Sequence, residues 1–186
     1  CIEALDLKGV DFPKPDVLLS VFGLAASREV PVATIAEPRF RDHDVNVDDV
    51  IRVQKLYDER KRELNAMDFD DLLVNGLKLF RERPSIREKY AERFRYVMVD
   101  EYQDTNAFQA EWVDAIASRH RNLLVVGDDF QSIYSWRGAD FRNFLSFQKR
   151  YPDAKTFKLE TNYRSVPEIL AVANASIAGN PEQFQK

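Results

Sequence analysis

Two adjacent carboxylates at the end of an apolar run are the first residues of this chain that could do chemistry. The run VMV at residues 97–99 leads directly into Asp100 and Glu101. An aspartate at a strand tip can hold Mg²⁺, which gives up its water reluctantly and takes few protein carboxylates. A second carboxylate beside it can orient and deprotonate an attacking water. The alternative is that the pair only ends a strand that leads to a helix capped near Thr105 or Asn106.

A second polar group follows another apolar run, NLLVVG at residues 122–127, in which Gly127 allows a tight exit. Gln131 could hydrogen-bond a phosphate oxygen or a metal-bound water. Tyr134, Trp136 and Arg137 then place two rings beside an arginine. Such a set suits the stacking of nucleic-acid bases and the pairing of a backbone phosphate. Packing of both rings in the core is the competing interpretation.

A third group, Tyr163 and Arg164, stands directly before a helix expected to begin near Val166. Ser165 and Glu168 have the spacing of a capping box at that helix start. The arginine could reach an anionic ligand, and the tyrosine ring could stack on a base. The alternative is a surface arginine that pairs with an acid.

The elements that position these groups are predicted to alternate between strand and helix. Alternation of this kind favours an α/β fold, with a parallel sheet and crossover helices. The first two strands are nearly continuous apolar runs, as expected for strands covered on both faces. Ligands of open parallel sheets bind beyond the carboxyl ends of the strands, so all three polar groups are expected at one edge. The expected elements are the strands 95–100, 122–127 and 154–160 and the helices 107–118, 140–150 and 166–178.

The first part of the chain is predicted to be helical. Residues 1–47 contain short apolar patches and four prolines, which favours short helices and loops. Residues 48–66 are expected to form one amphipathic helix, and Pro84 is expected to divide two further helices at 69–83 and 85–94. The apolar stripe of the amphipathic helix comprises Val50, Val53, Leu56, Tyr57 and Leu64.

Composition narrows the class of protein. The 186 residues are 45% hydrophobic and 31% charged, which is typical of a soluble globular protein, and no apolar run approaches the length that crosses a bilayer. We therefore expect a cytoplasmic protein with no membrane partner. The single cysteine and two histidines disfavour a disulfide framework and a transition-metal site. A net charge of −4 disfavours a broad basic face for duplex DNA but leaves single strands open, since stacking can hold them.

Several longer stretches resemble a known family in their order and spacing. They are similar to the Walker B, third and fourth motifs of the UvrD/Rep/PcrA family of superfamily 1 DNA helicases, and to the segment that commonly precedes them. In chain order, that preceding segment and the three motifs are MDFDDLL (67–73), VDEYQDTN (99–106), VVGDDFQSIYSWRGAD (125–140) and LETNYRS (159–165). The resemblance covers about residues 48–186. Two departures, Tyr102 for the usual Phe and Phe130 for a frequent third Asp, touch no position with an implied catalytic role.

The resemblance implies a fold and a set of roles toward ATP. Residues 67–186 would form a partial RecA-like ATPase domain, and residues 1–66 a helical segment belonging to its inserted helical subdomain. Asp100 would coordinate Mg²⁺ with Glu101 beside it, and Glu101 would activate the water that attacks the γ-phosphate. Gln131 would sense that phosphate. Tyr163 would stack on adenine, and Arg164 would act as an arginine finger.

The resemblance also implies a DNA partner and a larger parent protein. Tyr134, Trp136 and Arg137 would contact single-stranded DNA in an ATP-dependent helicase of DNA repair or replication. The sequence contains no Gly-x-x-x-x-Gly-Lys-[Ser/Thr] loop to cradle the phosphates. We therefore expect an internal fragment of the first motor domain that is inactive alone and whose partners include the missing parts of the helicase.

Two other classes of function compete with the motor. A metal-dependent nuclease could use Asp100, Glu101, Asp128 and Asp129, but no strand carries the Glu-x-Lys that would favour it. A non-catalytic DNA- or protein-binding module with a decayed ATPase fold is the second. Retention of Asp100, Glu101, Gln131 and Arg164 together speaks against decay.

Overall fold

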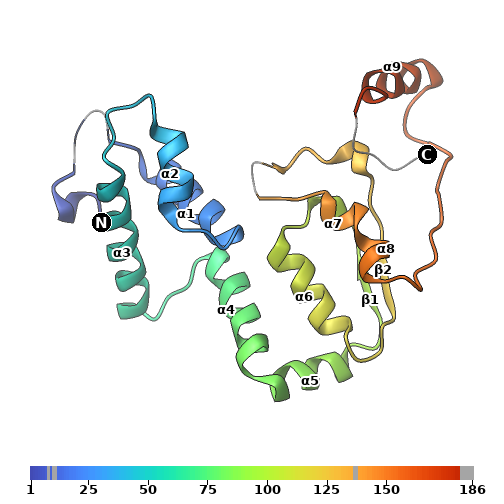
Figure 1. Cartoon of the computed structure of the whole chain (residues 1–186), viewed down its shortest axis with the longest axis horizontal. Helices are drawn as coiled ribbons and strands as arrows, with labels where there is room; N and C mark the ends of the chain where they lie inside the picture. The colour runs from blue at the N-terminus through green and yellow to red at the C-terminus, as the bar shows by residue number, and fades with distance from the viewer. Residues whose placement is uncertain (8, 10–11, 136–137, 181–186) are drawn as a thin grey trace.

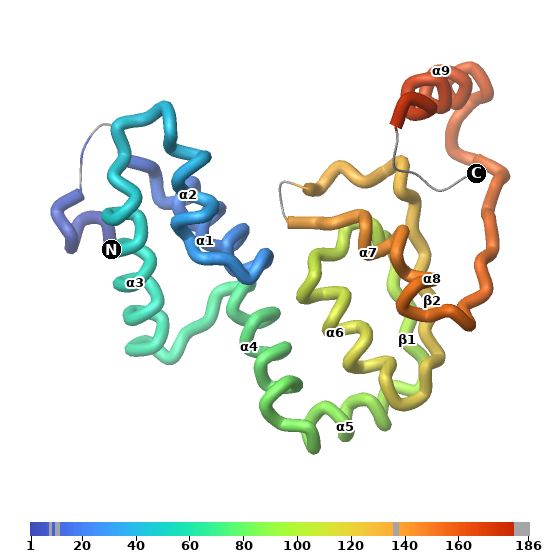
Figure 2. Tube along the Cα trace, viewed as in Figure 1, coloured from blue at the N-terminus to red at the C-terminus, as the bar shows by residue number. Residues whose placement is uncertain are grey.

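The computed structural model describes residues 1–7, 9, 12–135 and 138–180. Figure 1 shows a group of helices on one side and a small sheet with its own helices on the other, joined through α4. Figure 2 shows the chain running from the N-terminal helices through α4 and α5 into the sheet. None of the helices in the described ranges is both long and apolar enough to span a bilayer.

Three helices near the N-terminus pack around a core of their own. A short 3₁₀ turn, η1 (Glu3–Leu5), precedes α1 (Pro15–Ser27), α2 (Val32–Phe40) and α3 (Val47–Glu63). The predicted amphipathic helix is confirmed as α3, and Val50 and Val53 are buried. The prediction that Leu64 belongs to the apolar stripe of this helix is wrong. It follows the last helical residue, and 76% of it is exposed.

The next two helices lead from this core to the sheet. They are α4 (Phe69–Glu82) and α5 (Pro84–Arg93), and the predicted break at Pro84 is confirmed. Asp68 caps α4 through a reciprocal capping box with Asp71, and Lys61 of α3 lies 2.9 Å from Asp68 and 2.8 Å from Asp71. This junction fixes where α4 leaves the N-terminal helices.

The sheet consists of two parallel strands among the described residues. β1 (Val97–Val99) pairs with β2 (Leu123–Val125), and the crossover helix α6 (Ala107–Ala117) runs between them in sequence and contacts β1. Asn106 caps α6, as predicted. The predicted coverage of both faces is wrong for this chain, because Met98 and Leu124 on one face are 75% and 51% exposed.

The remaining elements follow the predictions only in part. The 3₁₀ turns η2 (Tyr102–Asp104) and η3 (Asp129–Gln131) follow the two strands. The predicted helix 140–150 is divided at Ser146 into α7 (Arg142–Leu145) and α8 (Phe147–Arg150). The final helix is confirmed as α9 (Pro167–Ile177).

The predicted third strand at 154–160 is wrong. Residues 154–160 form no strand, and Phe157 and Leu159 are 79% and 91% exposed. A strand needs a neighbouring strand to satisfy its backbone hydrogen bonds, and this segment runs away from the two-stranded sheet toward α9 (Figure 1). The α/β class therefore rests on a small parallel sheet within a mostly helical structure.

Candidate functional site

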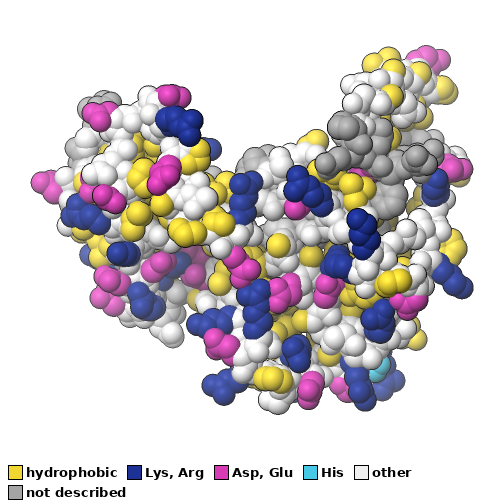
Figure 3. Space-filling view, viewed as in Figure 1, with side chains coloured by type: hydrophobic (Ala, Val, Ile, Leu, Met, Phe, Trp, Pro, Cys, Tyr) yellow, Lys and Arg dark blue, Asp and Glu magenta, His cyan; other side chains and the backbone are white. Residues whose placement is uncertain are grey.

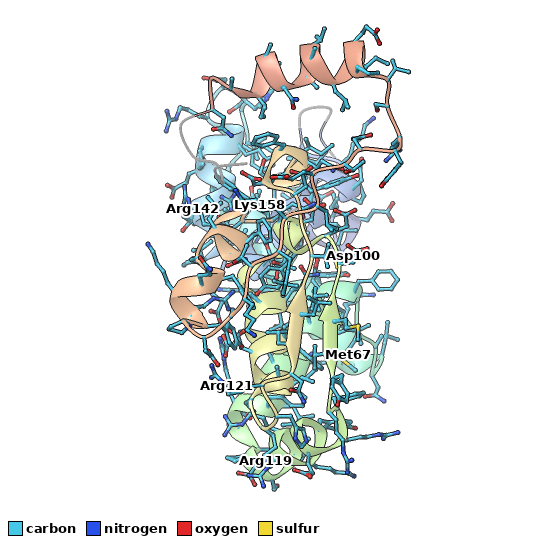
Figure 4. All side chains as sticks on the ribbon, turned by 90° about the vertical axis from the view of Figure 1, so that its right-hand side faces the viewer. Met67, Asp100, Arg119, Arg121, Arg142 and Lys158 are labelled. Atoms are coloured by element: carbon cyan, nitrogen blue, oxygen red, sulfur yellow. The ribbon has the colours of Figure 1, made fainter. Side chains whose placement is uncertain are left out.

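The backbone turns sharply where β1 ends. Glu101 has a left-handed conformation, with φ at 51°, and its N–H donates a 2.9 Å hydrogen bond to Oδ1 of Asp100. A left-handed conformation in a residue other than glycine costs roughly 1–3 kcal/mol and persists only where the surroundings fix it. Both carboxylates are exposed at the carboxyl end of the strand. Figure 4 shows Asp100 at the opposite end of the sheet from Arg121, which precedes β2.

The tips of the two strands are joined by Gln103. Its side chain is almost completely buried, at 1% exposure. Nε2 donates to Oε2 of Glu101 at 2.7 Å, and Oε1 accepts from the N–H of Asp128 at 3.0 Å. The backbone adds a second link, since the N–H of Tyr102 donates to the carbonyl of Val126 at 2.9 Å. The first two polar groups predicted from sequence therefore lie together.

Gln131 extends this set of hydrogen bonds. Its Nε2 donates to Oδ2 of Asp128 at 2.9 Å, while Oδ1 of Asp128 accepts from the N–H of Phe130 at 3.1 Å. A continuous series thus leads from Glu101 through Gln103 and Asp128 to the exposed amide of Gln131. Such a series can hold the carboxylate of Glu101 and the amide of Gln131 in a fixed position relative to one another.

Gly127 is required by the close approach of the two tips. A Cβ atom there would lie 2.7 Å from Oε1 of Gln103 and 3.2 Å from the ring of Phe144. The need for glycine comes from the packing of a buried amide, because Gly127 does not have the positive φ that only glycine readily adopts.

The aromatic residues of the second group are only partly described. Tyr134 is 38% exposed in the loop after η3, so it is not a core residue. Trp136 and Arg137 lie outside the described residues. Their expected contacts with single-stranded DNA stay a prediction.

The third group does not join the other two. Tyr163 is 94% exposed, and Oδ1 of Asn162 accepts from the N–H groups of Arg164 and Ser165. No hydrogen bond or ion pair between described residues connects Tyr163 or Arg164 with the strand tips. The predicted capping box at Ser165 is wrong, because α9 takes Val166 as its N-cap and Ser165 belongs to the turn closed by Asn162.

The donor set at the tip of β1 fits a hydrated Mg²⁺ held with a phosphate. In the described part of the chain, no group of three or more His, Cys, Asp and Glu side chains could hold a metal by itself. Mg²⁺ typically takes one or two carboxylates and completes its shell with water and substrate phosphates. Burial raises the pKa of Asp104, and the nearby charge of Glu101 raises it further. Asp100 with Glu101 beside it therefore suits a magnesium–nucleotide complex better than a bare ion.

Sequence reasoning missed the side chains that support this tip. Arg150 donates to the hydroxyl of Tyr102 at 2.7 Å and pairs with Asp114 of α6. The hydroxyl of Tyr151 donates to the same aspartate at 2.8 Å. Tyr102 is fully buried, so this cluster anchors the turn that follows Glu101. Gln103 was not predicted, because no feature of the sequence indicates that this glutamine is buried.

Comparison with known proteins identifies relatives of the whole central region. The sequence model of the UvrD/REP helicase N-terminal domain matches residues 24–152. The protein described as ATP-dependent DNA helicase PcrA from Staphylococcus aureus (strain NCTC 8325 / PS 47) is 49% identical over 137 residues, covering 72% of this chain and 19% of the relative. Its counterpart from Staphylococcus epidermidis (strain ATCC 12228 / FDA PCI 1200) is 48% identical over 137 residues, covering 74% and 19%. The chain thus spans about a fifth of the length of these relatives, and the match to the family includes both strand tips.

Proposed function

The chain belongs to the UvrD/REP helicase family, and on that premise we propose that it is part of an ATP-dependent DNA helicase. In the proposed activity, hydrolysis of ATP drives movement along single-stranded DNA and unwinding of duplex DNA, in repair or replication. The observation that carries the proposal is the hydrogen-bonded series that joins Glu101 and Gln131 across the two strand tips. The described sheet would be part of a RecA-like motor domain.

The chemistry at β1 follows from the positions of the two carboxylates. Asp100 would hold Mg²⁺, which when bound would neutralise charge on the transferred phosphoryl group. Oε2 of Glu101 is held by Gln103, and Oε1 makes no hydrogen bond to any described residue. Oε1 is therefore the atom that would take a proton from water as the water oxygen attacks the γ-phosphorus and ADP leaves.

The remaining nucleotide contacts would come from Gln131 and from the separate group of Tyr163 and Arg164. Gln131 would donate to a γ-phosphate oxygen through its exposed amide. Tyr163 would stack on adenine, and Arg164 would stabilise charge in the transition state. Both side chains are exposed, and the guanidinium of Arg164 forms no ion pair within the described ranges. Both side chains are therefore accessible to a nucleotide that is also bound by another part of a longer protein.

Contact with single-stranded DNA would depend on the loop after η3. We assign it to Tyr134, Trp136 and Arg137, by stacking and by one phosphate contact. Figure 3 shows lysines and arginines interspersed with acidic side chains, rather than a continuous basic surface, on the face it displays. Stacking would therefore supply much of the affinity. The 186 residues contain no phosphate-binding loop, so turnover is expected of a longer protein and not of this segment alone.

Substitution of Glu101 in the full-length helicase tests this proposal. Glu101→Gln is expected to lower DNA-stimulated ATP turnover by a factor of about 10² to 10⁴, because general-base assistance is lost. Binding of ATP should be retained, since the amide is isosteric with the carboxylate. Glu88→Gln, on the exposed surface of α5, is the matched control. Near-normal turnover in Glu101→Gln would remove Glu101 from the mechanism, and a wild-type protein without turnover would favour a decayed binding module.

A further inference from the structure

Gln103 has both polar ends of its buried side chain occupied by the two strand tips. We propose that it is a positioning residue, which holds the carboxylate of Glu101 in the orientation needed for hydrolysis and ties that orientation to the tip of β2. This inference rests on the proposed function, because it assumes that Glu101 acts on the attacking water. It concerns a residue to which the resemblance gives no role.

Among the described residues, Gln103 is the only one whose side chain is hydrogen-bonded to the carboxylate of Glu101. Glu101 is exposed, and a free glutamate side chain populates several rotamers whose loss on ordering costs conformational entropy. The 2.7 Å hydrogen bond from Gln103 fixes Oε2 and leaves Oε1 without a hydrogen bond to any described residue. A catalytic group that is already oriented avoids this ordering cost in the transition state.

Gln103 can act as an anchor because its own position is fixed. It is 1% exposed, and its Oε1 accepts the N–H of Asp128 at 3.0 Å. The neighbouring Tyr102 is fully buried and is held at its hydroxyl by Arg150 at 2.7 Å. The amide therefore cannot turn or withdraw without breaking a hydrogen bond in the interior.

The contacts specify glutamine rather than a residue of similar size. The side chain must donate at one end and accept at the other, which a primary amide does and a carboxylate does not. A glutamate at position 103 would keep the shape and the acceptor for Asp128. It would lose the donor and place a second negative charge 2.7 Å from the carboxylate of Glu101. An alanine would leave the N–H of Asp128 without its side-chain acceptor.

The same contacts connect Glu101 with the residue proposed to face the γ-phosphate. Asp128 receives its hydrogen bond from Gln131 at 2.9 Å, so a displacement of the β2 tip moves Gln131 and, through Gln103, also Glu101. Gln103 would therefore keep Glu101 and Gln131 in a fixed position relative to one another during hydrolysis. Its loss should affect the chemical step more than the binding of ATP.

The test uses Gln103→Glu and Gln103→Ala in the full-length helicase, with Gln148→Glu on the exposed surface of α8 as the control. We measure DNA-stimulated kcat, KM for ATP and affinity for single-stranded DNA. Because small misplacement of a catalytic group can cost about 10²-fold, both Gln103 variants should lose at least 10-fold in kcat with KM and DNA affinity unchanged. Gln148→Glu should behave as wild type. An unchanged kcat in folded Gln103→Glu would overturn the proposal.

A double variant separates positioning from a general structural role. In a Glu101→Gln background, Gln103→Ala should lower kcat little further, because the group that it positions is already absent. A full additional loss in that background would overturn the proposal, as would an equal rise in KM and fall in kcat. Near-normal turnover of Glu101→Gln itself would instead remove Glu101 from the mechanism and with it the role of Gln103, whereas a wild-type protein without turnover would reject the proposed function. An impaired Glu101→Gln beside an unimpaired Gln103→Glu would reject only the role of Gln103.

Discussion

Replacing Gly127 by alanine directly perturbs the contact between the two strand tips. The added Cβ would lie 2.7 Å from Oε1 of Gln103 and 3.2 Å from the ring of Phe144, and the first of these is too short for a carbon and an oxygen that are not bonded. Gln103 is buried and hydrogen-bonded at both ends of its amide, so it cannot move aside freely. The variant must therefore shift the β2 tip or break the bond to the N–H of Asp128.

The expected cost combines a steric and a polar contribution. Overpacking a well-packed site typically costs about 1–3 kcal/mol, and losing one hydrogen bond in the interior adds about 1 kcal/mol. Together they give a loss of about 2–4 kcal/mol in the free energy of unfolding. For a chain of this size each kcal/mol lowers Tm by about 2–4 °C, so a fall of roughly 4–16 °C is expected.

Thermal unfolding followed by circular dichroism measures this fall. Gly179→Ala is the matched control, because a Cβ at Gly179 would have no atom within 4 Å outside its own immediate surroundings. Gly127→Ala should also cost less in a Gln103→Ala background, where the nearest obstructing atom is gone. If Gly127→Ala and Gly179→Ala melt at the same temperature, the amide of Gln103 is not held between the tips and the reasoning fails.

Two further predictions concern the stability of the fold, one at the turn that follows β1 and one at the start of α4. Arg150→Met removes the charged partner of the buried Tyr102 hydroxyl, so it should lower the free energy of unfolding in denaturant by about 1–3 kcal/mol. The control Arg52→Met, in an exposed ion pair on one helix, should lower it by at most about 0.5 kcal/mol. Equal losses in the two variants would contradict the anchoring role of Arg150. Burial alone would raise the pKa of Asp68, but hydrogen bonds, one of them from Lys61, lower that pKa overall. A carboxylate whose pKa is lowered on folding stabilises the fold above its unfolded pKa of 3.8 and loses this contribution as the pH falls through the folded pKa. Tm should therefore fall more steeply below pH 3.8 in the wild type than in Asp68→Asn, and parallel profiles would contradict it.

Local sequence patterns correctly predicted the elements whose cause is local. The break at Pro84 follows from the missing N–H of proline, and the start of α6 follows from the side-chain cap at Asn106. The paired strands β1 and β2 were predicted from short apolar runs separated by a helix. The family was predicted from long motifs in a fixed order, and the match to residues 24–152 confirms it.

The errors arose where a feature depends on residues far away in the chain. An alternating pattern at 154–160 predicted a strand, but a strand exists only beside another strand, and none of the described strands lies next to this segment. Apolar character in β1 and β2 predicted two covered faces, whereas Met98 and Leu124 remain exposed on one face. The composition of a segment shows how much apolar surface it could bury, but not which other elements pack against that surface.

Residue types and their order along the chain are enough to predict candidate residues for chemistry: the Asp100–Glu101 pair, Gln131, Tyr163 and Arg164. Which of these residues lie together could be read only from the folded chain. It joined Glu101 to Gln131 through Gln103 and Asp128, and it left Tyr163 and Arg164 apart from that series. The physical reason is that a residue's chemical type is a local property, whereas contact between residues from different strands is set by parallel pairing and by the burial of side chains such as Gln103.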